Sequence, residues 1–512
     1  MSHPAAVPSA PDADPRTDLD TITARLTDLQ RGDLPTHGGR TLAYVYDSGL
    51  DEVTALGRAA LAQFGDSNGL DPTAFPSLQT MENDLVGLAA RLLHGPASAV
   101  GTFTSGGTES LLLAVLAARD GAPHAGGTRH TSMVIPTTAH AGFHKAGHYF
   151  GVDVIAVDVD PRTFRADPDA MAAAIRDDTV LAVASAPSYA HGVLDPVPHI
   201  AALAADRGIR CHVDACIGGW VLPHLTTPWA WDFAVPGVTS ISVDLHKYGY
   251  TPKGASLLLH RDPGLRRGHF FASAAWPGYT MLNSTMQSTK SGGPLAAAWA
   301  VTSAIGVPGY AALAATAREA TLAIAAGADG IPGITVVTPP DATLVVLVTD
   351  GSCDVFTVAD EMRVRGWFVQ PQMTYAALPA TLHLTVSAAT AASVPEFLAA
   401  LAESVAAAQA AGPVRVDPGL AAAAGALDPA TLTEADFDGL LQLAGLAGPG
   451  SAPGEGGGPG ASGSGSDAGP EAGGIRLPER MAQVNALLDV APPPLREALL
   501  LAVLDRLSRP TS

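Results

Sequence analysis

The segment from about residue 132 to 256 alternates short apolar runs with helical stretches, and this alternation constrains the fold more than any other feature. Apolar strands that alternate with helices are typical of a largely parallel sheet covered by helices, with functional groups at strand ends. We therefore expect an α/β fold. The expected strands are Met133–Ile135, Val152–Val157, Val180–Ala184, Arg210–Asp214, Ser240–Asp244 and Ser256–Leu259, with helices such as Pro168–Ile175 and Ile200–Arg207 between them.

The first candidate functional residue, Lys247, follows the fifth of these strands. In the stretch Ser240–Gly254, alternating apolar and polar residues give way to His246, Lys247 and a turn rich in Gly and Pro. A lysine just past a strand end, in a mostly apolar neighbourhood, can lose its proton near neutral pH and act as an amine nucleophile. Most lone lysines are solvated surface residues, so this interpretation depends on the residues that accompany Lys247.

A pair of glycines, Gly106 and Gly107, opens a strongly helical run. A helix start of this kind aims backbone N–H groups and the positive end of the helix dipole at an anion, and Ser105 and Thr108 add hydroxyl donors. The stretch matches neither the Walker A loop nor the GxGxxG pattern. It predicts a phosphate site, and an ordinary helix start with a flexible cap is the alternative.

Two further polar residues follow expected strands. Asp214 ends an apolar strand, where a carboxylate is costly unless it pairs with a cation such as the protonated ring nitrogen of a cofactor. A helix capped by Asp is the alternative. His140 follows another strand and could stack on a planar ring, and a structural histidine is equally consistent with that stretch.

These four features together meet the needs of pyridoxal 5'-phosphate. The lysine would hold its aldehyde as an imine, the helix start its phosphate, the aspartate its protonated pyridine nitrogen, and the histidine its ring face. A non-catalytic pyridoxal-binding protein is an alternative of a different class, and the intact set of Lys247, Asp214 and His140 argues against it. No metal site is predicted.

Several motifs resemble the sphingosine-1-phosphate lyases and their bacterial relatives, a branch of the group II pyridoxal-dependent decarboxylases of aminotransferase fold type I. The resemblance runs from about Val45 to about residue 410. The motifs are Thr104–Ser110 (TSGGTES), His212–Gly219 (HVDACIGG) and Asp244–Ser256 (DLHKYGYTPKGAS), together with Ala186–Pro196 and Val235–Ser240.

The resemblance implies a large domain with a mostly parallel seven-stranded sheet, a smaller C-terminal α+β domain, and a homodimer with active sites at its interface. It also implies that Lys247 is the Schiff-base lysine and Lys253 a second active-site lysine. The implied cofactor-binding residues are Gly106, Gly107, Thr108, His140, Asp214, His246 and Lys247, and the implied substrate residues are Tyr46, Asn68, Asp71, Lys253 and Lys290.

At two of these positions the chain departs from the lyases. Asp71 stands where a histidine facing the substrate phosphate is expected, and Lys290 where an arginine is expected. An aspartate repels a phosphate, and lysine lacks the bidentate recognition that arginine provides. We therefore expect poorer turnover of long-chain base phosphates than of a smaller or differently charged amine.

The expected reaction is cleavage of a bond at Cα of an amine substrate. In the lyase interpretation a base takes the β-hydroxyl proton and the Cα–Cβ bond breaks by retro-aldol cleavage. In the alternative, an amino-acid decarboxylase, the bond from Cα to the carboxylate breaks, and Lys253 or Lys290 would pair with that carboxylate. The bond perpendicular to the cofactor ring is the one that breaks.

Composition excludes several classes of partner. A net charge of −20 disfavours nucleic acid and anionic membranes. The three cysteines form no disulfide framework and no CxxC pair, which suits a reducing cytoplasm. We see no signal peptide and no uninterrupted apolar run long enough to span a bilayer.

The predicted organisation divides the chain into seven parts. They are a disordered tail (1–16), an N-terminal helical arm (17–100), the cofactor-binding domain (101–305), the small domain (306–412), a helical extension (413–447), a flexible Gly/Ser/Pro linker (448–476) and a C-terminal helical tail (477–512).

Overall fold

The computed structural model describes residues 19–122, 130–279, 281–443 and 478–509 of the 512-residue chain. The predicted tail (1–16) and linker (448–476) lie outside the described residues. The chain divides into two compact units, Thr36–Arg415 on the one hand and Met1–Pro35 with Val416–Ser512 on the other. The first unit contains all the predicted site residues, and the other predicted domain boundaries remain predictions.

A seven-stranded sheet forms the centre of the first unit, as predicted. Its strand order is β1-β7-β6-β5-β4-β2-β3, and only β7 runs antiparallel to its neighbours among the described strands. Strands β4 to β7 are buried along nearly their whole length, which explains their continuous apolar sequences. The strands are β1 (Val100–Thr104), β2 (Thr131–Pro136), β3 (Val152–Val157), β4 (Thr179–Ser185), β5 (Arg210–Asp214), β6 (Ser240–Val243) and β7 (Ser256–His260).

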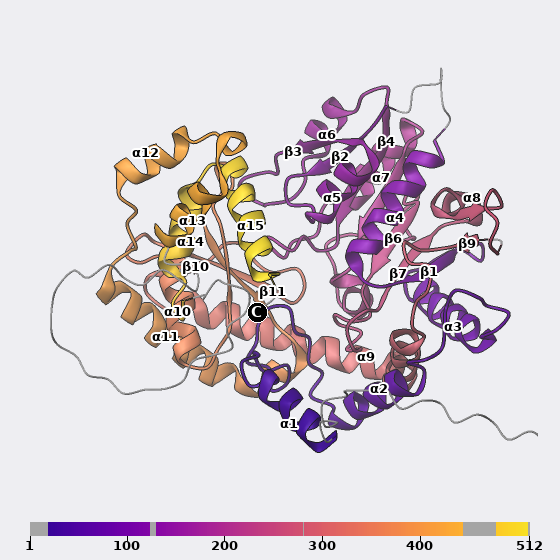
Figure 1. The fold of residues 1–512 in the computed structure, drawn as a ribbon, viewed down its shortest axis with the longest axis horizontal. Helices are drawn as coiled ribbons and strands as arrows, with labels where there is room; N and C mark the ends of the chain where they lie inside the picture. Colours follow the sequence, from indigo (N-terminus) through magenta and orange to yellow (C-terminus); the bar gives the residue numbers. More distant parts are fainter. Residues whose placement is uncertain (1–18, 123–129, 280, 444–477, 510–512) are drawn as a thin grey trace, which may run out of the picture. The chain divides into compact units, whose positions relative to one another are not determined.

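Helices from the crossover connections pack on this sheet (Figure 1). These are α4 (Gly107–Asp120), α5 (Gly142–Phe150), α6 (Pro168–Ala174) and α7 (Val197–Asp206). Before the sheet, α3 (Pro76–Leu92) packs on β1 and α2 (Asp51–Gln63) packs on α9 (Gly293–Ala328). Because β4, β5 and β6 are parallel and in register at Ser185, Asp214 and Ser242, their carboxyl ends form one edge. The fold thus brings the predicted strand-end residues together.

A smaller antiparallel sheet follows, with strand order β10-β11-β13-β12. It comprises β10 (Ile334–Val336), β11 (Leu344–Thr349), β12 (Gln370–Gln372) and β13 (Thr381–Thr385), and it packs with α10 (Val355–Val364) and α11 (Val394–Ala411). The sequence predicts strands at Thr335–Val337, Thr343–Thr349 and Leu382–Val386 and helices near Val358–Arg365 and Val394–Ala411, so β12 alone among these elements was not predicted. This sheet is the predicted small α+β domain in outline.

Helix α9 (Gly293–Ala328) is kinked, and its sequence predicted two helices, 298–305 and 311–326. The kink falls in the predicted gap, where Gly306 has non-helical angles (φ 62°, ψ 169°) and Pro308 follows. The segments Gly293–Ala328 and Ala388–Ala411 are long and apolar enough to cross a membrane by length and composition alone. This differs from the expectation of no such run, although α9 packs against α2, α3 and α11.

A two-stranded hairpin, β8 (Phe271–Ser273) with β9 (Met281–Asn283), was not predicted. It follows a short helix, α8 (Pro263–Arg266). Large apolar side chains are exposed on and around it, an arrangement more typical of an interface than of a solvated hairpin. These are Phe270, Phe271, Trp276, Tyr279, Leu282 and Met286.

The second unit contains helices α1 (Leu19–Gln30), α12 (Pro418–Ala426), α13 (Glu434–Leu443), α14 (Ala482–Val490) and α15 (Pro493–Leu507). The predicted helical pair at the C-terminus corresponds to α14 and α15. A small apolar cluster centred on Leu441 and Val484 joins α13, α14 and α15. Arg506, with a side chain only 6% exposed, pairs with Glu434 at 3.0 Å and Asp438 at 2.7 Å.

Candidate active site

A cavity of about 450 Å³ lies at the carboxyl ends of β4 and β5, between the two sheets of the first unit. It brings together the predicted residues Tyr46, His140, Asp214, His246, Lys247 and Lys253. Loops of the large sheet supply most of its wall, and the chain before α2 and strand β12 supply the rest. The other lining residues are Tyr44, Ser185, Pro187, Tyr189, Cys216, Ile217, Gln370, Pro371 and Gln372.

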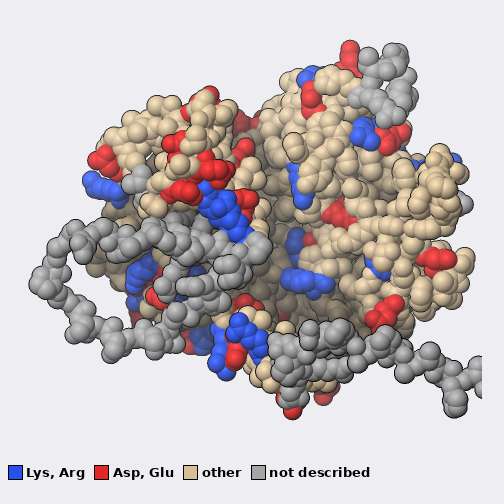
Figure 2. All heavy atoms as spheres, in the orientation of Figure 1, with Lys and Arg blue, Asp and Glu red and all other residues tan. Residues whose placement is uncertain are grey.

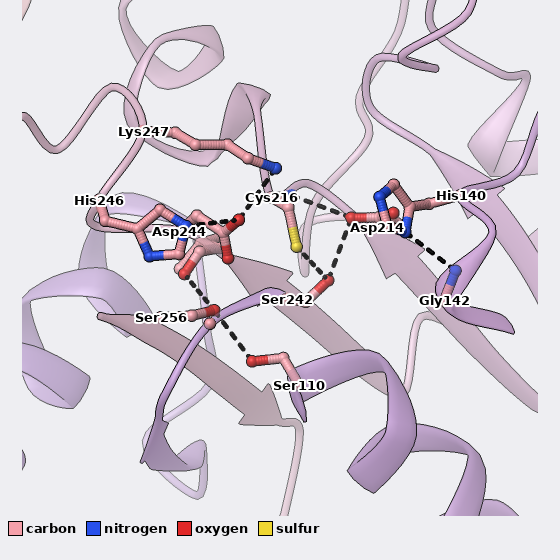
Figure 3. Close-up of polar contacts among 12 residues, drawn as sticks. Ser110, His140, Gly142, Asp214, Cys216, Ser242, Asp244, His246, Lys247 and Ser256 are labelled. Carbon is pink, nitrogen blue, oxygen red and sulfur yellow. Dashed lines mark hydrogen bonds and ion pairs between the residues drawn. The ribbon is translucent and has the colours of Figure 1, made fainter. Parts of the chain in front are cut away.

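Lys247 stands in the turn after β6, and its ammonium forms an ion pair with Asp244. The Nζ atom lies 2.9 Å from Oδ2 of Asp244, whose side chain is 1% exposed (Figure 3). His246 lies on the other side of the same carboxylate, with Nε2 3.7 Å from Oδ2. Burial opposes the ionised form of Asp244, but Lys247 and His246 hold its pKa below the usual range.

The turn is fixed by its next residue, Tyr248, which is fully buried. The Tyr248 hydroxyl donates a hydrogen bond to the carbonyl oxygen of Val386 at 2.8 Å and lies 3.4 Å from that of Thr343. Both acceptors flank strands of the small sheet, so the backbone at Lys247 is attached to both sheets.

The prediction that Lys247 loses its proton near neutral pH is wrong for the chain without a cofactor. Burial would lower its pKa, but the carboxylate of Asp244 outweighs burial and raises the pKa above the ordinary value. The sequence argument considered only the apolar neighbourhood and missed a counter-ion three residues away, which a turn brings under the ammonium.

Lys253 is the amine in this cavity whose pKa is lowered. Its Nζ donates to the carbonyl oxygens of Tyr44 at 2.8 Å and His246 at 3.2 Å, and it lies 5.1 Å from the centre of the Tyr46 ring. Burial of the amino group and repulsion by Lys247 lower its pKa to about 8. Lys253 is exposed as a whole residue, while the protein around Nζ shields the amino group from water.

Asp214 ends β5 as predicted, but hydrogen bonds rather than a cation stabilise its carboxylate. Oδ1 accepts from the backbone N–H of Cys216 at 3.1 Å and from the Ser242 hydroxyl at 3.3 Å (Figure 3). Ser242 also lies 3.2 Å from Nε2 of His212 and 3.3 Å from Sγ of Cys216. Oδ2 has no hydrogen-bond partner among the described residues and is left for a group in the cavity.

His140 lies in the turn between β2 and α5, where its side chain is exposed to the cavity. Its Nδ1 accepts a hydrogen bond from the backbone N–H of Gly142 at 3.0 Å, which fixes the ring orientation (Figure 3). The proton of the neutral imidazole is therefore on Nε2. A planar ring placed on the Asp214 side of the cavity would meet this imidazole.

The predicted helix start, Gly106 to Thr108, lies directly against the Lys247 turn. Gly106 adopts a positive φ of 157°, and a Cβ there would lie 3.3 Å from Cε1 of His246. A Cβ on Gly107 would lie 2.7 Å from Oδ2 of Asp244, so only glycine fits. Thr108 is exposed in the first turn of α4. The first N–H groups of α4 thus begin beside His246 and Asp244.

Pyridoxal 5'-phosphate fits these residues. The glycine pair leaves a hollow beside His246 that a Cβ would fill, and α4 directs N–H groups to it. An amine, Lys247, and a carboxylate oxygen with no partner, on Asp214, line one cavity with His140. No group of three or more His, Cys, Asp or Glu side chains that could hold a metal ion occurs in the part of the chain that the structure describes.

Three predicted substrate residues do not line this cavity. Asp71 and Lys290 line a second cavity of about 360 Å³, between α3, the start of α4 and the segment before α9. The Asp71 carboxylate accepts from the N–H of Thr73 at 2.8 Å and from its hydroxyl at 2.6 Å, so it stabilises its own turn. Asn68 caps the neighbouring turn through the N–H of Leu70 at 3.0 Å.

Tyr189, Tyr44 and Gln370 line the Lys247 cavity but were assigned no role from the sequence. Tyr189 lies within Ala186–Pro196, one of the motifs that resemble the lyases, so its position in that motif could have marked it as a site residue. Tyr44 donates a hydrogen bond to Oε1 of Gln370, which joins the chain before α2 to β12. Gln370 comes from a three-residue strand that no motif marks.

Comparison with known proteins gives one family. Residues 36–319 match the pyridoxal-dependent decarboxylase conserved domain, and residues 418–506 match a C-terminal putative HTH domain of pyridoxal-dependent enzymes. The chain is 37% identical over 345 residues to sphingosine-1-phosphate lyase of Dictyostelium discoideum, covering 66% of this chain and 63% of that protein. It is 35% identical over 399 residues to the sphingosine-1-phosphate lyase of Oryza sativa, covering 76% of this chain and 71% of that protein.

Solved structures give the same fold. Sphingosine-1-phosphate lyase of Burkholderia pseudomallei matches with a TM-score of 0.71 at 33% identity, over 79% of this chain and 94% of that chain. Glutamate decarboxylase of Lactobacillus brevis matches with a TM-score of 0.69 at 18% identity, over 81% of this chain and 97% of that chain. At that identity the match supports the fold alone. The predicted fold is confirmed.

Proposed function

We propose, from the premise that this chain belongs to the pyridoxal-dependent decarboxylase family, that it is a lyase which breaks the Cα–Cβ bond of an amino-alcohol phosphate. The relatives at 33–37% identity bear the name sphingosine-1-phosphate lyase, and the decarboxylase match is far more distant. The structure adds a physical argument, which rests on the second amine of the cavity, Lys253.

The cofactor, when bound, supplies an aldehyde that condenses with amines and a ring that takes up the electron pair of a bond breaking at Cα. Lys247 would hold the aldehyde, Asp214 the ring nitrogen and His140 the ring face. The phosphate would lie at the start of α4, beside His246. All other steps depend on side chains that orient the substrate or move its protons.

Lys253 carries the proposal because retro-aldol cleavage needs a base for the β-hydroxyl proton. Its Nζ lies at the cavity mouth, and its pKa of about 8, lowered by burial and by Lys247, leaves part of it neutral at pH 7 to 8. The backbone carbonyls of Tyr44 and His246 hold this nitrogen without adding a charge. Asp244 raises the pKa of Lys247 in the chain without cofactor, and Lys247 would hold the aldehyde when the cofactor is bound.

Decarboxylation makes the opposite demand on Lys253. A substrate carboxylate needs a cation beside it, and beyond Lys247 the described lining of the cavity offers only Lys253. One group cannot be the neutral base and the carboxylate's cation at once, so the reaction type decides its protonation state.

The test is a product assay on the purified enzyme loaded with pyridoxal phosphate. Sphingosine 1-phosphate, unphosphorylated sphingosine, glutamate and an aromatic amino acid are incubated in parallel, and aldehyde and CO₂ are both measured. We expect aldehyde from an amino-alcohol substrate and no CO₂ from the amino acids. Release of CO₂ without aldehyde would establish the decarboxylase instead.

We also propose that the enzyme is a homodimer. Exposed aromatic side chains on the β8–β9 hairpin suit a protein interface, and they adjoin the segment that carries Lys290. Sedimentation of the wild type is expected to give a dimer, and Trp276→Ser with Leu282→Ser a monomer. A wild-type monomer at micromolar concentration contradicts the proposal.

For its location we propose the cytoplasm. The support is chemical, because Cys211, Cys216 and Cys353 are all free and buried. Fractionation of cells that express a tagged chain is the test, and recovery in the membrane pellet after a high-salt wash would exclude the proposal.

A further inference from the structure

Behind the wall of the Lys247 cavity lies a buried histidine, His383, that touches the site without lining it. It is fully buried on β13, where it pairs across the sheet with Gln370 of β12 and Val346 of β11. Gln370 itself lines the cavity. His383 therefore occupies the layer of side chains immediately outside the site.

The first contact of His383 is with Tyr189. The two rings are stacked, with centroids 4.0 Å apart and planes inclined by 20°. Tyr189 lies in the loop after β4, and its phenol faces Tyr46, Tyr44 and Lys247. Its hydroxyl has no hydrogen-bond partner among the described residues, so the stack with His383 is the contact that orients the ring.

The second contact reaches Tyr46 through Thr385. Nε2 of His383 lies 2.9 Å from Oγ1 of Thr385, and the Thr385 side chain acts on the pKa of the Tyr46 phenol, so it lies beside that hydroxyl. A threonine hydroxyl can donate one hydrogen bond and accept another, so Thr385 can link His383 to Tyr46. Tyr46 in turn lies beneath the ammonium of Lys253.

His383 cannot itself act as an acid or base in this chain. Burial lowers the pKa of His383 to about 3. Nearby His191 also lowers this pKa, and a hydrogen bond between His383 and the backbone of Tyr189 opposes the shift. The ring stays neutral at any working pH, so its effect on the site is one of geometry. The ring is stacked on one phenol of the cavity, Tyr189, and is hydrogen-bonded to Thr385 beside the other, Tyr46.

We propose that His383 is a positioning residue, which orients Tyr189 by stacking and Tyr46 through Thr385 so that both phenols face the reacting carbons. The inference rests on the proposed lyase function. Tyr189 and Tyr46 come from segments far apart in the sequence, and β13 is the element that both contact. Misplacing either phenol by about 1 Å is expected to reduce turnover ~10- to 100-fold.

Two variants break the link to Thr385 and keep a ring stacked on Tyr189, namely Thr385→Val, which removes the hydroxyl, and His383→Phe, which keeps a ring for stacking. Both variants are expected to lose kcat by ~10-fold or more, with KM changed less than kcat. Thr385→Ser is expected to restore the wild-type kcat because it restores the hydroxyl. The control is His191→Phe, a buried histidine stacked on Phe164 at 4.4 Å outside the cavity, which should leave kcat unchanged.

Two further measurements detect the role without turnover. The Kd of the cofactor-free variants for pyridoxal phosphate is expected to stay within about two-fold of wild type, because neither residue lies at the cofactor. Nitration of Tyr189, mapped by mass spectrometry, is expected to speed up in His383→Ala, since the stack covers one ring face. A wild type with no lyase turnover would refute the proposed function. An active wild type with unchanged kcat in Thr385→Val and unchanged nitration in His383→Ala would refute the inference.

Discussion

The ammonium of Lys247 lies 2.9 Å from a carboxylate oxygen of Asp244, and that carboxylate is also the surface against which Gly107 packs. One buried aspartate thus connects the lysine turn with the start of α4. The pair explains why the lysine is protonated in the chain without cofactor, and it links the reactive amine to the predicted phosphate site.

Replacing Asp244 with Asn is expected to lower the pKa of Lys247, because the counter-ion is lost while the burial remains. Lys247 of the cofactor-free variant should therefore react with an amine-directed reagent at lower pH than in wild type. Peptide mapping across a pH series measures this, with Lys253 as the internal comparison. An unchanged pH dependence at Lys247 would show that Asp244 does not control its proton.

We expect kcat/KM of the enzyme to follow the protonation state of Lys253. Since the neutral amine is the active form, kcat/KM should rise as pH increases through about 8 and level off above it. Lys253→Met should remove this inflection and reduce kcat ~10²- to 10⁴-fold. Lys253→Arg keeps the charge but not a titratable amine, so rescue by Arg would mean that Lys253 binds the substrate and does not move a proton.

Asp71→Asn tests the departure from the lyase pattern. Asparagine retains an oxygen for the N–H and hydroxyl of Thr73, so the turn is preserved while the negative charge is removed. If Asp71 lies near the substrate phosphate, KM for the phosphorylated substrate should fall several-fold and KM for the unphosphorylated one should not change. Equal effects on both substrates would place Asp71 away from that phosphate.

Acid should destabilise the protein below about pH 6.5. Burial lowers the pKa values of His191, His212 and His269 to about 4, with Asp214 opposing the shift at His212. The unfolded chain binds protons as pH falls below 6.5 and the folded chain does not, so the free energy of unfolding decreases from pH 6.5 towards pH 4. Urea unfolding at several pH values measures this. His269→Gln should reduce the slope by about one proton, and a flat profile would contradict the prediction.

The second unit is expected not to bind nucleic acid, although residues 418–506 match a putative HTH domain. Arg506 is occupied by Glu434 and Asp438, and Arg509 lies 2.5 Å from Asp505. Figure 2 shows acidic side chains beside basic ones on its visible face. Fluorescence anisotropy with a labelled duplex at about 50 mM salt checks this. Binding that weakens steeply with salt would overturn it.

The sequence predicted six strands of the large sheet, and burial explains the apolar patterns of the central ones, β4 to β7. Val152–Val157 and Arg210–Asp214 match β3 and β5 to the residue, although β3 is an edge strand in which only Val152 is buried. The three-residue strands β8, β9 and β12 were missed because so short a segment carries little periodicity, whereas β10, equally short, was predicted from its sequence Ile-Thr-Val. The edge strand β1 was missed because its sequence was interpreted only as the approach to a helix.

The sequence predicted those site residues that belong to a recognisable motif. It did not predict the contacts between residues that only the folded chain brings together. Lys247, Asp214 and His140 do line one cavity, as strand ends in one sheet must. The roles of Asp244 and Tyr189 depend on a turn and a loop whose shape the sequence does not specify. Asp71 and Lys290 were grouped with Lys247 by resemblance, and the chain places them in a separate cavity.

The buried hydroxyl of Tyr248, bonded to the carbonyl of Val386, has a mechanical consequence. The lysine and the small sheet are separated by a single peptide unit and one hydrogen bond, so neither can move independently. Any rocking of the small sheet during a catalytic cycle would swing the reactive amine with it. A probe attached to α11 should therefore report what happens at the lysine, which makes the distant helix an indicator of the chemistry.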